Sequence, residues 1–78
     1  HKGRDVYYQP YIYAGDQKFR NGKYSEAIAY YDEALDIKEL SSIYLKKSIA
    51  NKYLFQWEES IAQWENYLSV ARLSKERR

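Results

Sequence analysis

Apolar residues recur with helical spacing along most of this chain. Between Tyr24 and Lys38 they return at intervals of three and four positions, which places them on one face of an α-helix. Charged residues of the same segment, such as Glu26 and Asp32, fall on the opposite face. The pattern therefore predicts an amphipathic helix whose acidic side chains contact water.

The same pattern returns 33 residues downstream. Trp57 and Trp64 then occupy the places of Tyr24 and Tyr31, so the large aromatic positions are kept. The offset also relates identical residues at Tyr11 and Tyr44, Glu26 and Glu59, Ile28 and Ile61, Ala29 and Ala62, and Leu35 and Leu68. A period between about 20 and 50 residues is typical of proteins in which one helical or stranded unit stacks on the next.

Each of these segments follows another one with helical character, which gives four helices paired as two antiparallel hairpins. The expected helices span about 10–21, 24–38, 42–54 and 57–72. Gly22 marks the first break, because glycine readily adopts the left-handed conformation that ends a helix. The second break, at Phe55 and Gln56, has no glycine, so the turn there is inferred from the repeat.

The buried face of the third helix stays open at this point. The two candidate stripes are Ile43, Ala50 and Leu54 on one face, and Leu45, Ile49 and Tyr53 on another. Lys47 and Asn51 stand where the first unit leads one to expect apolar residues. The sequence alone therefore does not choose between the stripes.

These residues resemble the tetratricopeptide repeat, a helix-turn-helix unit of about 34 residues with a W-x2-L-G-x2-Y…A-x3-F…P pattern. The most specific match is the run GKYSEAI at 22–28. Tyr67 departs from the pattern where a small residue is expected, and Glu39 replaces the final proline. The positions that match the signature core are Tyr11, Gly15, Tyr24, Ala27, Tyr31 and Ala34 in the first unit, and Trp57, Ser60 and Trp64 in the second.

The resemblance implies an all-α fold of antiparallel helical hairpins, a fragment of an α-solenoid. We expect a single domain over 1–78, with the first unit at about 8–39, the second at about 41–72 and a basic tail at 73–78. Small residues such as Gly15 and Ala27 suit the points where two helices cross closely.

The resemblance also implies a peptide-binding groove, because the first helices of tetratricopeptide hairpins line a concave surface. The matching positions are Gln9, Ile12, Asp16, Phe19 and Arg20 in the first unit, and Leu45, Ile49, Lys52 and Tyr53 in the second. An alternative is that Ile12, Phe19, Leu45 and Ile49 only pack against neighbouring helices. The subclass that binds the terminal carboxylate of chaperones uses Lys and Asn where this chain has Ile12 and Asp16. Because an Asp repels a carboxylate, we do not expect that specificity here.

Composition supports one small domain and little catalytic chemistry. The 78 residues contain no Cys, and the single histidine is His1. There is no Gly-rich phosphate loop, and we expect no enzyme activity, no cofactor and no metal site. The neighbouring acids Asp32 and Asp36, and Glu58 and Glu59, are interpreted as solvated helix faces.

Charge and aromatic residues bear on nucleic-acid binding. Lys and Arg gather at the ends, whereas residues 5–71 hold seven basic and ten acidic side chains. A nucleic-acid-binding domain usually concentrates basic residues on its folded body, so we do not expect nucleic acid as the partner. Most aromatic residues have core spacing, and the better candidates for surface contacts are Tyr7, Tyr8 and Tyr13.

These observations predict a non-catalytic protein-interaction module that binds a peptide or helix through an apolar and aromatic groove. One alternative is a structural repeat that self-associates, and a second is an RNA-binding helical repeat. Two units fall short of the three that repeat folds usually need for stability. The last predicted helix also leaves apolar side chains uncovered at Leu68, Val70 and Leu73. Both observations favour a homo-oligomer. No membrane span is expected, and nothing in the sequence identifies a compartment.

Overall fold

The computed structural model describes residues 7–76, and this part of the chain is all-α. The helices are α1 (Gln9–Arg20), α2 (Tyr24–Ile37), α3 (Ser41–Tyr53) and α4 (Trp57–Glu76). No strand occurs among the described residues. The all-α prediction is therefore confirmed, and each of the four helices begins within one residue of the start that the hydrophobic periodicity predicts.

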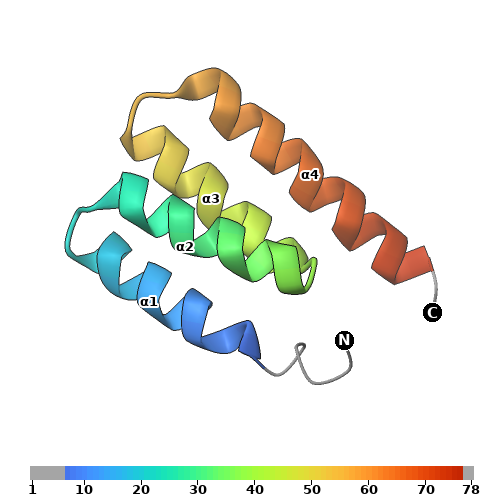
Figure 1. The fold of residues 1–78 in the computed structure, drawn as a ribbon. Coiled ribbons are helices and arrows are strands. Elements are labelled where there is room, and N and C mark those ends of the chain that lie inside the picture. The colour runs from blue at the N-terminus through green and yellow to red at the C-terminus, as the bar shows by residue number, and fades with distance from the viewer. Residues whose placement is uncertain (1–6, 77–78) are drawn as a thin grey trace.

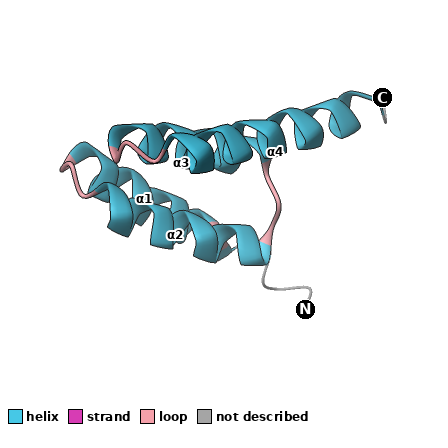
Figure 2. Cartoon of the chain, turned by 90° about the horizontal axis from the view of Figure 1, so that it is seen from above, coloured by secondary structure: helices cyan, strands magenta, loops and turns pink. Residues whose placement is uncertain are grey.

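Successive helices run in opposite directions and form two hairpins, α1/α2 and α3/α4 (Figure 1). Seen from above, the hairpins make two layers (Figure 2). The layers meet chiefly where α2 packs against α3. Within residues 7–76, no helix combines the length and apolar character needed to cross a membrane.

The last helix is longer than expected. It continues to Glu76, whereas the periodicity ends it at about 72. Nothing in 73–76 interrupts a helix, because this segment contains neither Gly nor Pro. The predicted basic tail is thus the end of α4 as far as residue 76, and residues 77–78 lie outside the described part of the chain.

Both hairpin turns use the same backbone device, although only one has a glycine. After α1, the amide of Lys23 donates to the carbonyl of Lys18 and that of Gly22 to Phe19. After α3, the amides of Gln56 and Phe55 repeat this pattern at 2.9 and 3.0 Å. Paired bonds of this kind define a Schellman motif, whose central residue is left-handed. Gly22 has φ 78° and Phe55 has φ 61°, so Phe55 takes the place of a glycine.

The core lies between the first three helices. Its fully buried members are Ala27, Tyr31 and Ala34 of α2 and Ile43 of α3, with Ala50 also buried. The choice left open for α3 is thereby settled in favour of the face with Ile43 and Ala50, while Ile49 and Tyr53 are exposed.

Two polar residues occupy this buried face of α3, and each has a partner. Lys47 forms an ion pair with Asp32 of α2. The side-chain amide nitrogen of Asn51 donates to Oε1 of Gln56 at 2.9 Å in the following turn. The ion pair of Lys47 and the donated hydrogen bond of Asn51 offset part of the cost of placing polar groups on this face, whereas Oδ1 of Asn51 is buried without a hydrogen-bond partner in the described chain.

Small residues lie inside both hairpins. Gly15 of α1 is buried against the ring of Tyr31, and a Cβ added at Gly15 would approach Cε1 of that ring to 2.6 Å. In the second hairpin, the hydroxyl of Ser48 donates to the carbonyl of Ser60 and that of Ser60 donates to the carbonyl of Ser48, both at 2.9 Å. The helices of α1/α2 therefore approach closely because Gly15 has no side chain. The helices of α3/α4 are joined at the corresponding place by the two hydrogen bonds between Ser48 and Ser60.

Candidate peptide-binding groove

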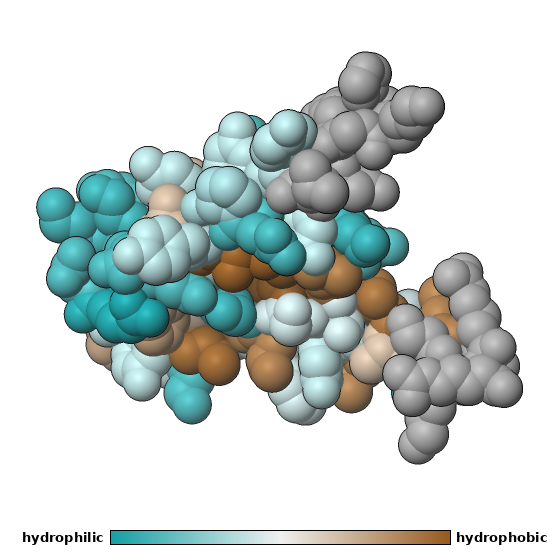
Figure 3. Space-filling model, turned by 90° about the horizontal axis from the view of Figure 1, so that it is seen from below, coloured by the Kyte–Doolittle hydropathy of each residue, from teal (hydrophilic) through white to brown (hydrophobic). Residues whose placement is uncertain are grey.

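A cavity of about 210 Å³ opens between α1 and α3, with α2 behind it. Its lining residues are Asp16 and Phe19 of α1, Tyr31 of α2, and Lys46 and Ile49 of α3. Figure 3 views the molecule from the side of α1, and a band of apolar residues crosses the middle of that face between more hydrophilic ones. The cavity therefore combines apolar walls with a charged centre.

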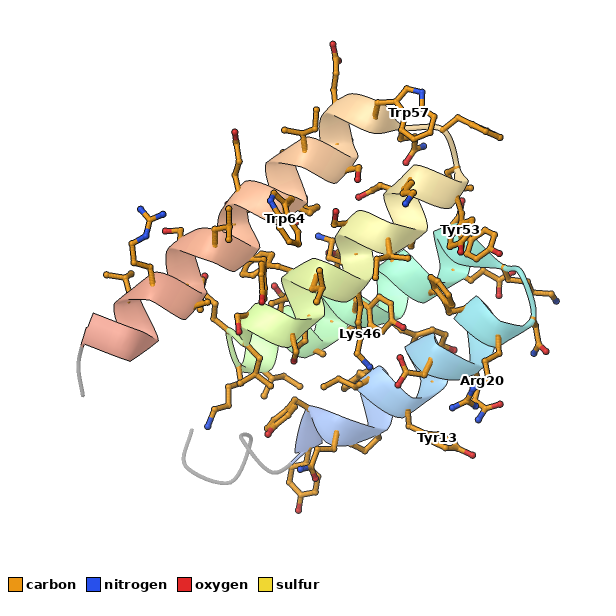
Figure 4. The ribbon with its side chains drawn as sticks, turned by 180° about the vertical axis from the view of Figure 1, so that it is seen from behind. Tyr13, Arg20, Lys46, Tyr53, Trp57 and Trp64 are labelled. Atoms are coloured by element: carbon orange, nitrogen blue, oxygen red, sulfur yellow. The ribbon has the colours of Figure 1, made fainter. Side chains whose placement is uncertain are left out.

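The polar centre joins three helices through the carboxylate of Asp16. The hydroxyl of Tyr31 donates to Oδ1 of Asp16 at 2.5 Å. The ammonium of Lys46 lies 3.0 Å from each carboxylate oxygen (Figure 4). Asp16 thus accepts hydrogen bonds from α2 and α3, and the ammonium of Lys46 balances its charge at the surface of the groove.

Tyr31 is a neutral hydrogen-bond donor over the ordinary pH range. Burial raises the pKa of its phenol, and the hydrogen bond to the carboxylate of Asp16 raises it further. The absence of a Cβ at Gly15 allows the ring of Tyr31 to lie directly against α1, because a Cβ there would come within 2.6 Å of the ring. The floor of the cavity is consequently held in place by backbone on one side and by Asp16 on the other.

An aromatic cluster closes the groove near the α1/α2 turn. The ring of Phe19 meets Tyr24 and Tyr53 edge-on, with centroids 5.1 and 5.8 Å apart. Tyr24 and Tyr53 stack at 5.0 Å. Tyr53 therefore connects the end of α3 to the first hairpin, and it leaves part of its ring exposed.

The structure brings together some of the residues predicted for the groove and separates others. Asp16, Phe19 and Ile49 line the cavity, and Tyr53 lies in the aromatic cluster beside it. Ile12 packs against the core and does not line the cavity, whereas Phe19 lines the cavity and also packs against the core. The remaining predicted positions lie outside the cavity lining, with Leu45 half-buried and Gln9, Arg20 and Lys52 exposed.

Two lining residues were missed at the level of sequence. The sequence-based prediction places Tyr31 in the core alone and does not include Lys46. The spacing contained the necessary information for Lys46, because Lys46, Ile49 and Tyr53 follow one another at intervals of three and four on one face of α3. Its pairing with Asp16 spans 30 residues and has no local sequence pattern.

Acidic residues and surface tyrosines offer no comparable site in the described chain. Residues 7–76 contain no cluster of three or more His, Cys, Asp or Glu side chains with the spacing of a metal site. Of the surface tyrosines, Tyr7 and Tyr13 are exposed. Tyr8 packs against the core, and the ammonium of Lys38 lies 5.9 Å from the centre of its ring.

Comparisons with known proteins found no matching family model, no similar curated protein and no similar solved structure. The resemblance to tetratricopeptide repeats therefore stays a prediction from the residues quoted above.

Proposed function

We propose that this chain is a non-catalytic, tetratricopeptide-like interaction module that binds a short peptide or helix in the groove between α1 and α3. The observation that supports it is the cavity of about 210 Å³, in which Phe19 and Ile49 flank the Asp16–Lys46 pair. Ligand pockets typically combine such apolar walls with a few fixed polar groups.

The apolar walls are suited to one side chain of the ligand. Ile49 is 38% exposed, so its covering by a partner removes apolar surface from water without requiring the core to open. Phe19 is held by its contacts with Tyr24 and Tyr53. A wall that is already ordered loses little conformational entropy on binding, which favours affinity.

The charged centre is suited to the peptide backbone. An ammonium group has three N–H donors. Lys46 directs its charge at Asp16, and its side chain is still partly open to solvent. It can therefore donate to a carbonyl of the bound peptide. Because Lys46 is already paired with Asp16, the centre offers no net positive charge to a free carboxylate, and we expect internal peptide segments to bind better than free acidic C-termini.

Selection from a random peptide display library with the intact 78-residue chain tests this proposal. Enriched peptides are expected to shift NMR resonances of Phe19, Lys46 and Ile49, and to lose about tenfold or more in affinity on Ile49→Glu, which places a charge at an apolar contact. Ile61→Glu is the matched control, because Ile61 is an exposed isoleucine of α4 outside the cavity.

Two results would overturn the proposal. One is that enriched peptides bind the Ile49→Glu variant as tightly as the original chain. The other is that their resonance shifts fall on α4 and not around the cavity. Circular dichroism of both variants establishes that each remains folded.

A further inference from the structure

Helix α4 exposes a continuous stripe of large apolar side chains. Its members recur at intervals of four, three and four residues, and we call this set the α4 stripe: Trp57 (55% exposed), Ile61 (58%), Trp64 (44%) and Leu68 (39%). In Figure 4 the two labelled tryptophans lie along α4, away from Lys46 and Arg20, which mark α3 and α1. The stripe is therefore a surface distinct from the groove.

The same positions are covered in the first hairpin. The residues 33 places earlier are Tyr24, Ile28, Tyr31 and Leu35, all of which are half-buried or buried. There α2 is enclosed by α1 on one side and α3 on the other, whereas among the described residues α4 packs chiefly on α3. A core-type stripe is thus left open to water, and exposed apolar patches of this kind typically mark an interaction surface.

Charge along one flank of the stripe indicates what covers it. Glu58, Glu65 and Arg72 are exposed and seven residues apart, so they follow the same edge of the helix. The first half of this flank is acidic and its end is basic. The sequence from 72 onward continues the basic character, with four basic residues and one acidic residue.

We propose that the α4 stripe binds the α4 stripe of a second copy of this chain, with the two helices antiparallel about a two-fold axis. This orientation sets Glu58 of each copy opposite Arg72 of its partner, twice in one interface. A parallel arrangement would instead set like charges together. An interface about a two-fold axis uses the same patch on both copies, as a single self-complementary stripe requires.

The arrangement fixes what lies at its centre. Residue 65 is midway between 58 and 72, so the axis passes near Glu65, the Trp64 side chains of the two copies lie beside it, and Trp57 of each copy lies opposite the exposed Leu73 of the other. Aromatic residues at the centre of an interface contribute strongly to its stability. The two Glu65 side chains are the one like-charged pair, so Glu65→Gln is expected to tighten the dimer.

Sedimentation equilibrium on the 78-residue chain tests the proposal. The original chain is expected to be a reversible dimer, and Ile61→Glu a folded monomer. The single variants E58R and R72E each replace two attractions by two repulsions, and are expected to weaken the dimer by about tenfold. The double variant E58R/R72E restores attraction and is expected to recover the original affinity.

Recovery by the double variant distinguishes an antiparallel pair from other contacts, because a parallel pair or a head-to-tail stack gives no such rescue. Ile49→Glu, which alters only the groove, should leave the dimer unchanged. The proposal is overturned if the original chain stays monomeric at about 1 mM, where even weak association is detectable. It is equally overturned if the double variant is no tighter than the single ones while circular dichroism shows all of them folded.

Discussion

At the scale of single residues, the turn after α3 carries a backbone cost that the turn after α1 avoids. Phe55 is left-handed at φ 61°, in the place that Gly22 occupies at φ 78°. A side chain in this conformation costs roughly 1–2 kcal/mol because its Cβ crowds the following carbonyl. Phe55 recovers little by burial, since it is 76% exposed and only meets Trp57 edge-on.

We therefore expect Phe55→Gly to raise the free energy of unfolding by about 1 kcal/mol. Gly22→Ala, the reciprocal change at the equivalent turn, should lower the free energy of unfolding by about the same amount. Urea denaturation of the two variants measures both changes. A loss of stability in Phe55→Gly would mean that the contact with Trp57 outweighs the backbone strain.

Tyr31 gives the fold a pH dependence at its alkaline limit. Its pKa is raised above the ordinary value of 10.0 by burial and by Asp16, so the folded chain favours the neutral phenol more than the unfolded chain does. Its contribution to stability is complete below about pH 10 and is lost as the pH rises through the raised folded pKa. Alkaline conditions should therefore unfold the protein in part through this one residue.

Tyr31→Phe isolates the effect. At neutral pH we expect the variant to be less stable by about 1–2 kcal/mol, because the hydrogen bond to the carboxylate of Asp16 is lost. Between pH 9 and 12 the variant should lose less stability than the original chain, so the two curves converge. Parallel curves over that range would show that Tyr31 ionises equally well in the folded state.

At the scale of helices, the α1/α2 hairpin depends on the absence of one Cβ. Alanine normally stabilises a helix relative to glycine by roughly 0.5–1 kcal/mol. At Gly15 the new Cβ would lie 2.6 Å from a buried ring that Asp16 holds in place. We expect Gly15→Ala to destabilise by about 1–3 kcal/mol, as overpacked cores do.

The direction of the change in stability separates the two effects. Helix propensity alone predicts that Gly15→Ala is more stable, whereas the contact with the Tyr31 ring predicts that it is less stable. Thermal unfolding followed by circular dichroism is sufficient to measure it. A more stable Gly15→Ala variant would show that the ring of Tyr31 can move away from α1. The cavity floor would then be less rigid than the structure indicates.

Local patterns predict the helices themselves well. Spacing of apolar residues locates all four within a few positions, because this signal needs only neighbouring residues. The buried face of α3 was not predictable, since Lys47 and Asn51 on it depend on Asp32 and Gln56 for partners. The end of α4 was placed too early because the break in apolar periodicity does not stop a helix that lacks Gly and Pro.

The candidate site was predictable only in part, for a related reason. Asp16, Phe19 and Ile49 follow from helix faces and from the resemblance to a repeat. The pairing of Lys46 with Asp16 and the hydrogen bond from Tyr31 require the packing of three helices. Such contacts join residues 15 and 30 positions apart, so no local pattern contains them.

At the scale of the whole molecule, the proposed groove and the α4 stripe lie on different helices. The groove uses α1, α2 and α3, and the stripe belongs to α4. The serine pair Ser48–Ser60 separates them at the α3/α4 contact. Binding of a peptide and pairing of two copies therefore need no common residue, and one can be removed while the other is kept.

The small core makes pairing visible in thermal stability. Tyr31 and Ile43 are the largest side chains that are fully buried in the described chain, so a single copy has little apolar burial to sustain it. If two copies unfold together, mass action raises the melting temperature with protein concentration. For a chain of this length we expect a rise of about 4 °C for each tenfold increase in concentration.

The same measurement on variants assigns the effect to one surface. Ile61→Glu should melt at a temperature that does not depend on concentration, because its stripe no longer pairs. Ile49→Glu should keep the full dependence, since Ile49 lies in the groove and not on α4. Equal dependence in both variants would mean that copies associate through a surface other than α4, and a flat curve for the original chain would mean that one copy is stable alone.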